Sequence, residues 1–247
     1  MMRLVLLGTS GYHPSDERQT ACLMLPEVGI LLDAGTALFR AADYLVTDRL
    51  DIFLTHAHLD HIVGLTYLLD VLAVCPVKRT TVYGTADVLQ AVEEHLFAPA
   101  VFPVPPRFDL KRLPAQLTLT AGGRLTHFHL AHPGGSIGFR LDFPPHSLAY
   151  VTDTTAAPNA AYRAAIEGVD LLVHECHFAA DEPELAQLTG HSCLTDVARL
   201  AAQADVGQLV LVHINPRDGG PSESDLAVAR TVFPHIVVGH DRDEFHF

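Results

Sequence analysis

The feature that most constrains the fold is the alternation of short apolar runs with single helical segments. The apolar runs have the length and composition of buried strands and include residues 3–8, 51–55, 170–175 and 207–214. Apolar residues recur at helical spacing in the segments between them, among others at 36–48, 59–74, 192–204 and 221–233. Strand-rich blocks joined to single helices, twice over, predict two β-sheets packed face to face with helices outside, in two similar halves.

Local signals refine this pattern at four places. Thr36 and Ser192 stand where helix N-caps are expected, because a side-chain hydroxyl can accept from the first turn. Residues 99–116 carry five prolines and are expected to form an irregular connection, the best candidate for a binding segment. The end of the chain, residues 235–247, is expected to form a strand pair. With 247 residues, 49% of them hydrophobic, the chain is expected to fold as a single domain over residues 1–247.

The charge balance argues against broad electrostatic binding of nucleic acid. Lys and Arg number 16 against 29 acidic residues, giving a formal net charge of −13. A strong bulk attraction to RNA or to an anionic membrane is therefore not expected, although a local cationic site is compatible with it. No apolar run approaches the roughly 20 residues of a membrane span. Four cysteines without CxxC spacing indicate free thiols in a reducing cytoplasm, so a cytoplasmic protein is expected.

A dense cluster of histidines and acid follows the apolar run 51–55. His56 and His58 stand in a loop at the end of that strand, where residues two apart face the same way and can share one metal. Asp60 and His61 stand where a helix begins and point elsewhere. Four ligands so close in sequence could hardly close one tetrahedron, so they predict two adjacent metals with two of these ligands each.

Each metal needs further ligands, and three residues at strand ends fit. His132 ends the run "THFHLAH", Asp153 ends "LAYVTD" and His213 ends "LVLVH". The predicted first metal site comprises His56, His58 and His132; the second comprises Asp60, His61 and His213. Asp153 is expected to bridge the two metals, with a hydroxide as the other bridge.

The remaining histidines receive a structural interpretation. His129 is expected to face the opposite side of its strand from the site. His174 and His177 are interpreted as structural as well, with a pocket-lining role as the alternative. No substrate-binding residue is assigned from the sequence.

The segment "THAHLDH" resembles the HxHxDH signature of the metallo-β-lactamase superfamily, and the three later ligands follow in the order that this superfamily uses. The resemblance implies a four-layer αββα sandwich, an α/β fold that some schemes class as α+β, with a dinuclear site at one edge. The chain is more specifically similar to ribonuclease Z and its relatives. The segments that carry this similarity occur in the same order: "LGTSG", "LLDAG", "FLTHAHLDHIVGL", "GSIGFR", "VTDT", "LLVHECHF", "GHS" and "LVLVHINPR".

The resemblance also implies two residues that assist catalysis. Glu175 in "HEC" and His191 in "GHS" fall on a pair in which a carboxylate orients an imidazole, and the imidazole donates a proton to the leaving oxygen. Asp60 is the third expected catalytic residue. Ribonuclease Z typically carries a long tRNA-gripping arm between the segments that match residues 138–140 and 152–155. Here only 11 residues separate them, enough for one hairpin, so the chain is closer in build to the small phosphodiesterases of the same branch.

The predicted function is that of a dinuclear metal-dependent hydrolase, a phosphodiesterase acting on nucleotides or short RNA through a metal-bridging hydroxide. Two divalent ions are expected, zinc by the imidazole-rich ligands, with manganese or iron as alternatives. The first alternative is tRNA 3′ processing of the ribonuclease Z type, and the second is a lactonase or other C–O or C–N hydrolase. A metal-dependent binding protein without turnover is the non-enzymatic alternative. Family similarity is compatible with a homodimer.

Overall fold

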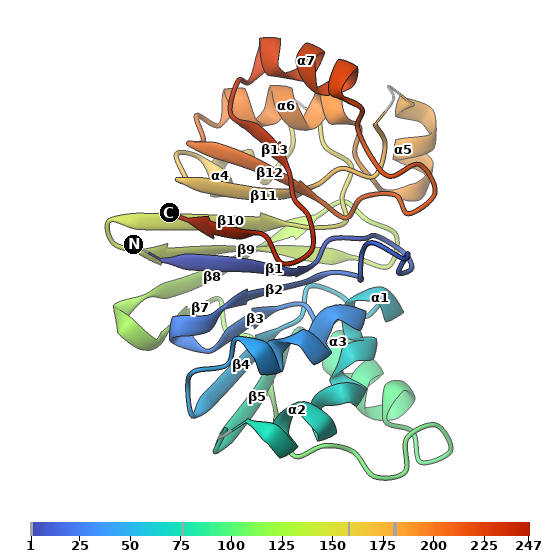
Figure 1. Cartoon of the computed structure of the whole chain (residues 1–247), viewed down its shortest axis with the longest axis vertical. Helices are drawn as coiled ribbons and strands as arrows, with labels where there is room; N and C mark the ends of the chain where they lie inside the picture. The colour runs from blue at the N-terminus through green and yellow to red at the C-terminus, as the bar shows by residue number, and fades with distance from the viewer. Residues whose placement is uncertain (1, 76, 158, 180–181) are drawn as a thin grey trace. The chain divides into compact units, whose positions relative to one another are not determined.

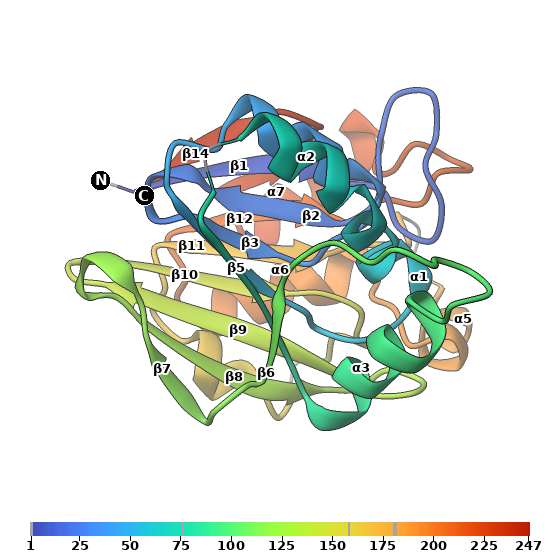
Figure 2. The ribbon, with the colours of Figure 1, turned by 90° about the horizontal axis from the view of Figure 1, so that it is seen from below.

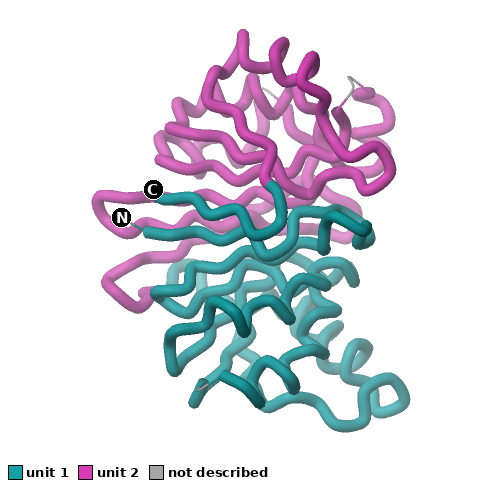
Figure 3. The backbone as a smooth tube through the Cα atoms, viewed as in Figure 1, with its two compact units in different colours: residues 1–117, 240–246 teal, residues 118–239, 247 magenta. Residues whose placement is uncertain are grey.

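The computed structural model describes residues 2–75, 77–157, 159–179 and 182–247. The chain divides into two compact units (Figure 3): unit 1 comprises residues 1–117 and 240–246, and unit 2 comprises residues 118–239 and 247. Each unit is described by itself, and the single domain expected over 1–247 stays a prediction. Among the described residues, no helix is long and apolar enough to cross a membrane.

Unit 1 is built on a seven-stranded sheet in which antiparallel pairing gives way to parallel pairing (Figures 1 and 2). In spatial order its strands are β14 (Glu244–His246), β1 (Arg3–Gly8), β2 (Cys22–Leu25), β3 (Ile30–Leu32), β4 (Arg49–Phe53), β5 (Arg79–Gly84) and β6 (Asp109–Arg112). The strands from β3 to β6 are parallel. The end of the chain joins this sheet because β14 pairs antiparallel with β1, as the teal trace shows (Figure 3).

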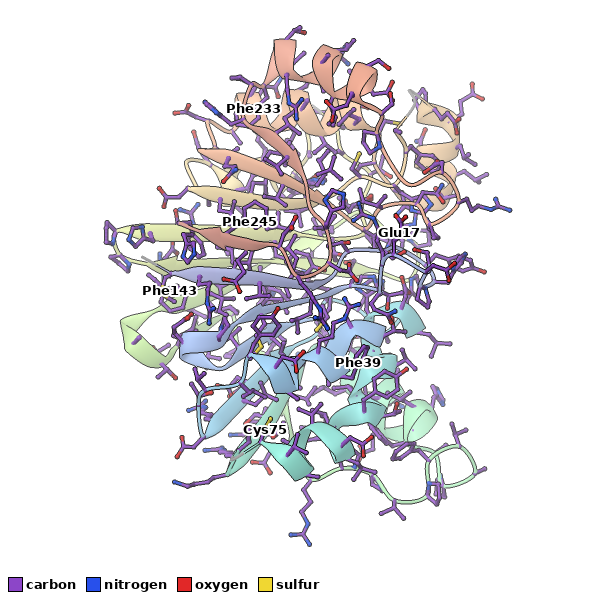
Figure 4. All side chains as sticks on the ribbon, viewed as in Figure 1. Glu17, Phe39, Cys75, Phe143, Phe233 and Phe245 are labelled. Carbon is purple, nitrogen blue, oxygen red and sulfur yellow. The ribbon has the colours of Figure 1, made fainter. Side chains whose placement is uncertain are left out.

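Helices cover one face of this sheet. They are η2 (Thr36–Asp43), α1 (Leu59–Ile62), η3 (Val63–Tyr67), α2 (Leu68–Val74), α3 (Ala86–Ala91) and η4 (Val92–Leu96), whereas the short η1 (Pro26–Val28) forms the turn between β2 and β3. Leu50 and Ile52 of β4 pack with Leu38 of η2 and Leu65 of η3 in one buried cluster. Phe39 points from η2 toward solvent and is 48% exposed (Figure 4). Because side chains alternate between the two faces of a strand, Leu50 and Ile52 of β4 both point into the helical layer.

Unit 2 repeats the same plan. Its sheet runs in the order β13 (Ile236–Val238), β12 (Gln208–Val212), β11 (Leu171–Glu175), β10 (His146–Val151), β9 (Ser136–Phe143) and β8 (Arg124–Leu130). The edge strand of this sheet, β7 (Gln116–Thr118), spans the point where the chain passes from unit 1 into unit 2. The helical segments are η5 (Thr120–Gly122), α4 (Arg163–Ile166), α5 (Pro183–Thr189), α6 (Leu194–Gln203) and α7 (Glu223–Val232). Leu172 of β11 and Leu209 of β12 pack with Val197 of α6 and with Phe233, labelled beside α7 in Figure 4.

The segment expected as one helix over 59–74 has the expected bounds but is not continuous. The helix expected over 59–74 is broken into three pieces, because Gly64 approaches the preceding loop: its N–H donates to the Ala34 carbonyl at 2.8 Å. A Cβ on Gly64 would lie 2.1 Å from the Gly35 oxygen, so close approach of the two backbones requires glycine here. The sequence also predicts that Pro76 ends this helix, and Pro76 lies outside the described residues.

The two expected N-caps were also wrong. Thr36 is the first residue of the 3-10 helix η2, and its Oγ1 accepts from the backbone N–H of Thr20 at 2.9 Å. Ser192 precedes the cap of α6, and its Oγ donates to the Thr154 carbonyl at 2.7 Å. Each hydroxyl forms a hydrogen bond with a segment distant in sequence, and neither caps its helix.

Two longer segments also differ from expectation. The proline-rich connection 99–116 contains the strand β6, which pairs in parallel with β5 at the edge of the unit 1 sheet. The expected strand pair at 235–247 is two strands in different sheets: β13 pairs with β12, and β14 pairs with β1. α5, which the pattern of apolar residues did not predict, follows β11 in unit 2.

The strands of unit 2 place chemistry-bearing residues at one edge of its sheet. β8 and β10 both run antiparallel to β9, and β10, β11 and β12 run parallel to one another. The carboxyl ends of β8, β10, β11 and β12 therefore meet at the same edge, where open α/β sheets bind ligands.

Candidate metal centre and active site

The histidine-rich motif of unit 1 lies between β4 and α1. The rings of His56 and His58 have centroids 4.5 Å apart, and those of His56 and His61 are 4.2 Å apart. His61 Nε2 lies 3.5 Å from Asp60 Oδ2. His56 and His61 are buried, whereas His58 is exposed and Asp60 is half-buried. The local fold thus gathers all four predicted ligands of unit 1 into one group.

A buried carboxylate orients two of these imidazoles. Asp33, at the carboxyl end of β3, accepts from His61 Nδ1 at 2.8 Å and from the backbone N–H and hydroxyl of Thr55. Thr55 Oγ1 lies 3.0 Å from His56 Nδ1 in turn. Such contacts on Nδ1 fix the ring so that Nε2 is the nitrogen presented to a metal. Sequence reasoning missed Asp33, although an acid directly after a buried strand in "LLDAG" is the signal that could have identified it.

The Asp60 carboxylate is oriented from a different loop. Its Oδ2 accepts from the backbone N–H of Tyr12 at 2.8 Å. Tyr12 has a positive φ of 65°, an uncommon conformation for a residue with a large side chain. The loop after β1 therefore holds its N–H toward the predicted ligand.

In unit 2, one carboxylate lies between two imidazoles. Asp153 Oδ2 is 3.6 Å from His132 Nε2, and Asp153 Oδ1 is 3.2 Å from His213 Nε2. Asp153 and His213 are each 2% exposed. His132 Nδ1 contacts the Gly190 carbonyl at 2.9 Å, which again directs Nε2 toward the carboxylate. The three predicted ligands of this unit, far apart in sequence, are thus brought together.

Glu175 and His191 also meet in unit 2. Glu175 ends β11 and is fully buried; its Oε1 lies 3.3 Å from His191 Nδ1. The backbone N–H groups of Thr154 and His177 donate to the same carboxylate at 3.2 Å and 3.0 Å. Burial raises the pKa of the Glu175 carboxyl well above its usual value, and the Asp153 carboxylate adds to this rise. The electrostatic interaction with His213 and these backbone donors oppose it. The contact on Nδ1 leaves Nε2 as the nitrogen that His191 can present to a substrate.

His177 joins this group, although the sequence gave it a structural interpretation. Its ring stacks on that of His191 with centroids 4.7 Å apart, and it lies 5.8 Å from that of His213. His177, His191 and His213 can each offer one nitrogen within 4.8 Å of the others. His174, on the other side of Glu175, is a core residue whose Nε2 contacts the Tyr162 hydroxyl at 2.8 Å.

The residues of each unit fit divalent metal chemistry. Neutral imidazoles and carboxylates are ligands that zinc, manganese and iron accept. These side chains are buried or half-buried except for the exposed His58, and the contacts on Nδ1 supply the outer hydrogen bonds that metal-ligating histidines usually make.

Comparison with known proteins decides the family. Residues 29–214 match the family model described as Beta-lactamase superfamily domain. The chain belongs to the metallo-β-lactamase superfamily. The recognition made from "THAHLDH" is thereby confirmed, and membership makes the chain a metal-dependent hydrolase.

Relatives within the superfamily are ribonucleases by name. Ribonuclease BN from Erwinia tasmaniensis is 28% identical over 97% of this chain and 98% of its own length. Ribonuclease Z from Bradyrhizobium sp. is 29% identical over 98% of this chain and 99% of its own length. The two alignments extend over 303 and 306 positions, more than the 247 residues of this chain, so the relatives hold segments that this chain lacks.

Solved structures confirm the fold class. The metallo-β-lactamase fold protein YhfI from Bacillus subtilis is 22% identical, with a TM-score of 0.83 and coverage of 100% of both chains. A diphosphatase from the PhnP family is 20% identical, with a TM-score of 0.76 over 100% of this chain and 97% of that one. The predicted αββα fold of the superfamily is therefore correct.

Proposed function

We propose that this chain is a dinuclear metal-dependent phosphodiesterase that acts on nucleotides or short RNA. The observation that carries the proposal is the Glu175–His191 pair beside Asp153 and His213. A phosphodiester with an alkoxide leaving group requires a proton at the leaving oxygen, and an imidazole held by a buried carboxylate is suited to supply it. The names of the ribonuclease relatives and of the PhnP-family diphosphatase agree with phosphoryl chemistry.

The proposed metal sites keep the two ligand sets that the sequence predicts. The two oxygens of Asp153 face two different imidazoles, as a bridging carboxylate requires, so unit 2 offers each metal one histidine and one oxygen. Since a tetrahedral site needs more ligands, the remaining ones are taken from the sequence prediction. The first site would comprise His56, His58, His132 and Asp153; the second would comprise Asp60, His61, His213 and Asp153.

The protein's own residues perform the remaining tasks. Divalent ions, when bound, supply Lewis acidity and a water of lowered pKa. Asp33 holds His61, and Tyr12 holds the Asp60 carboxylate, so the unit 1 ligands are set in orientation. Glu175 keeps the His191 ring directed, and His191 Nε2 protonates the leaving oxygen.

One parallel assay tests this function. The zinc- and manganese-loaded protein is given a dinucleoside monophosphate, a precursor tRNA, a lactone and nitrocefin. The dinucleoside monophosphate is expected to be hydrolysed with the highest kcat/KM. Turnover of the lactone or of nitrocefin at a higher kcat/KM than the diester would contradict the proposal.

The second candidate function is tRNA 3′ processing, which the curated ribonuclease Z and BN relatives favour. Against it, β9 and β10 form a hairpin joined only by Pro144 and Pro145, so no arm extends from this region. Cleavage of precursor tRNA at its 3′ side, faster than cleavage of the dinucleoside monophosphate, would establish this candidate instead.

A further inference from the structure

A cavity of about 620 Å³ lies in unit 2 beside the proposed proton donor. His191 and His132 line it together with residues of α5 and of the loops after β8 and β10. α5 stands beyond the end of the unit 2 sheet, whereas α6 and α7 cover its face (Figure 1). Neither the sequence motifs nor the relatives assign a role to this cavity.

The cavity must receive the leaving group if His191 is the proton donor. Proton transfer requires the donor within hydrogen-bond reach of the leaving oxygen, about 2.6–3.2 Å. Glu175 engages His191 Nδ1, so the transfer uses Nε2 of a ring that forms part of the cavity wall. The atoms attached to the leaving oxygen then extend into the space that this wall encloses.

The chemistry of the walls defines what fits. Six of the thirteen lining residues are alanine or proline: Ala131, Pro133, Ala156, Ala157, Pro183 and Ala186. The polar lining includes the amide of Gln187 and the carboxylate of Asp196, and among the described residues no Lys or Arg lines the cavity. Asp196 is paired at 3.4 Å with Arg199, which lies outside the lining. Away from His132 and His191, the walls offer small apolar surface, one amide, one carboxylate and Thr155. This set favours a neutral group with hydrogen-bond donors and disfavours an added phosphate.

The walls are also held in place before any ligand arrives. The backbone N–H of Thr155 donates to the Ala131 carbonyl at 3.1 Å, and the backbone N–H of His191 donates to the Ala186 carbonyl at 2.9 Å. Thr155 Oγ1 reaches the same Ala186 carbonyl at 3.5 Å. A preformed pocket of this kind selects its ligand without a large ordering cost.

We propose that this cavity binds an uncharged alcohol leaving group, such as the nucleoside released from a small phosphodiester, and excludes a leaving group that carries its own phosphate. The inference rests on the proposed function and deepens it. It restricts the substrates to small diesters whose leaving group is a neutral nucleoside or a similar alcohol. RNA whose leaving group contains further phosphates is excluded as a substrate.

The experiment compares three substrates with the zinc-loaded full chain. They are a dinucleoside monophosphate, the same compound with an extra 3′-terminal phosphate, and the same compound with an extra 5′-terminal phosphate. One of the two phosphorylated compounds carries its charge on the leaving nucleoside. We expect kcat/KM for that compound to fall about 10-fold or more, while the other stays within about 3-fold of the parent.

Gln187→Lys adds a lysine to a lining that has no Lys or Arg among the described residues. Gln187 is exposed at the cavity rim, so this change does not disturb the core. For the compound that carries its extra phosphate on the leaving nucleoside, we expect kcat/KM to be at least about 5-fold higher in this variant than in the wild type. Gln203→Lys, at the end of α6, makes the same charge change beside a different cavity of this unit and should leave the substrate ratios unaltered.

The outcomes separate the two proposals. Equal kcat/KM for all three diesters, or an equal response to Gln187→Lys and Gln203→Lys, would overturn the leaving-group pocket while diester hydrolysis stands. Failure to hydrolyse any of the three would overturn the proposed phosphodiesterase itself and the pocket assignment with it.

Discussion

At the scale of single residues, His191 and Glu175 form the pair on which the proposed chemistry depends. The imidazole needs the carboxylate to fix its ring, and the carboxylate is held by backbone N–H groups of Thr154 and His177. The His177 ring stacks on the His191 ring. His177 therefore anchors Glu175 through its backbone N–H and supports His191 through its side chain.

Replacing His191 tests proton donation directly. His191→Ala is expected to lower kcat about 100-fold or more on a dinucleoside monophosphate, because the alkoxide leaves unprotonated. On a p-nitrophenyl diester, whose leaving group needs no proton, the loss should be below about 10-fold. His235→Ala, an exposed histidine of the same unit, is the matched control. Equal losses on the two substrates would show that His191 does not act as the acid.

His174 gives a prediction about stability and pH. Full burial lowers its pKa from 6.5 to about 4, so the folded protein keeps it neutral where the unfolded chain binds a proton. The contribution of neutral His174 to the free energy of unfolding is therefore fully present above pH 6.5 and is lost as the pH falls toward 4. Relative to His174→Gln, the metal-free wild type should lose about 3 kcal/mol of unfolding free energy between pH 7 and pH 4.

Urea denaturation of both proteins at several pH values measures this difference. Using the variant as the reference removes the contributions of other titrating groups, including Glu175, whose raised pKa has the opposite slope. We predict that His174 binds a proton only in the unfolded chain. A difference in unfolding free energy between the two proteins that does not change with pH would contradict this prediction.

At the scale of elements, the turn after α5 connects helix geometry to a predicted ligand. Gly190 has φ 74°, and its carbonyl accepts from His132 Nδ1. A Cβ at this position would lie 2.2 Å from Pro133 Cδ and 2.8 Å from His132 Nδ1. Glycine is therefore required both by the left-handed conformation and by the close approach of this loop.

Two glycine substitutions separate these requirements. Gly168 also has a positive φ, 64°, but a Cβ there meets nothing within 4 Å. Gly168→Ala and Gly190→Ala should each cost about 1–2 kcal/mol of unfolding free energy from backbone strain, and Gly190→Ala should cost more. Only Gly190→Ala should displace His132 and lower zinc affinity, by about 10-fold or more. Zinc affinity is measured by competition with a chelator. An equal affinity in the two variants would show that this turn does not affect the metal site.

The capping box of α7 yields a smaller effect. Ser222 Oγ accepts from the Asp225 N–H, and the Asp225 carboxylate accepts from the Ser222 N–H. Ser222→Ala should cost about 1 kcal/mol of unfolding free energy without changing hydrolysis, since no predicted ligand lies on this helix. Val228→Ala, an exposed change on the same helix, serves as the control in thermal unfolding.

At the scale of the whole molecule, the proposed metal sites depend on ligands that lie far apart in the sequence. Zinc at 100 times its dissociation constant should raise the unfolding free energy by about 3 kcal/mol over the chelated protein. His61→Ala in unit 1 and His213→Ala in unit 2 should each abolish most of this gain. The exposed His240→Ala and His235→Ala changes should preserve it.

Metal analysis completes this prediction. The reconstituted wild type should hold about two ions per chain. Full retention of the zinc-dependent gain in either His61→Ala or His213→Ala would show that one unit suffices, and well under two ions in the wild type would contradict the dinuclear assignment.

The sequence by itself determined the elements and their chemistry. Apolar runs ending in histidine or acid predicted the strands, and the spacing of His56, His58, Asp60 and His61 identified the superfamily, because both signals are local. The resemblance to ribonuclease Z selected Glu175 and His191, and the structure places them within 3.3 Å of each other.

Only the tertiary structure decided the contacts between segments distant in sequence. Ser192 ties a loop instead of capping α6, β13 and β14 join different sheets, and Asp33 and Tyr12 orient ligands from loops that carry no motif. The cavity lined by α5 was invisible in the sequence because small apolar residues carry no chemical signature. Their significance comes from the space that they enclose beside His191.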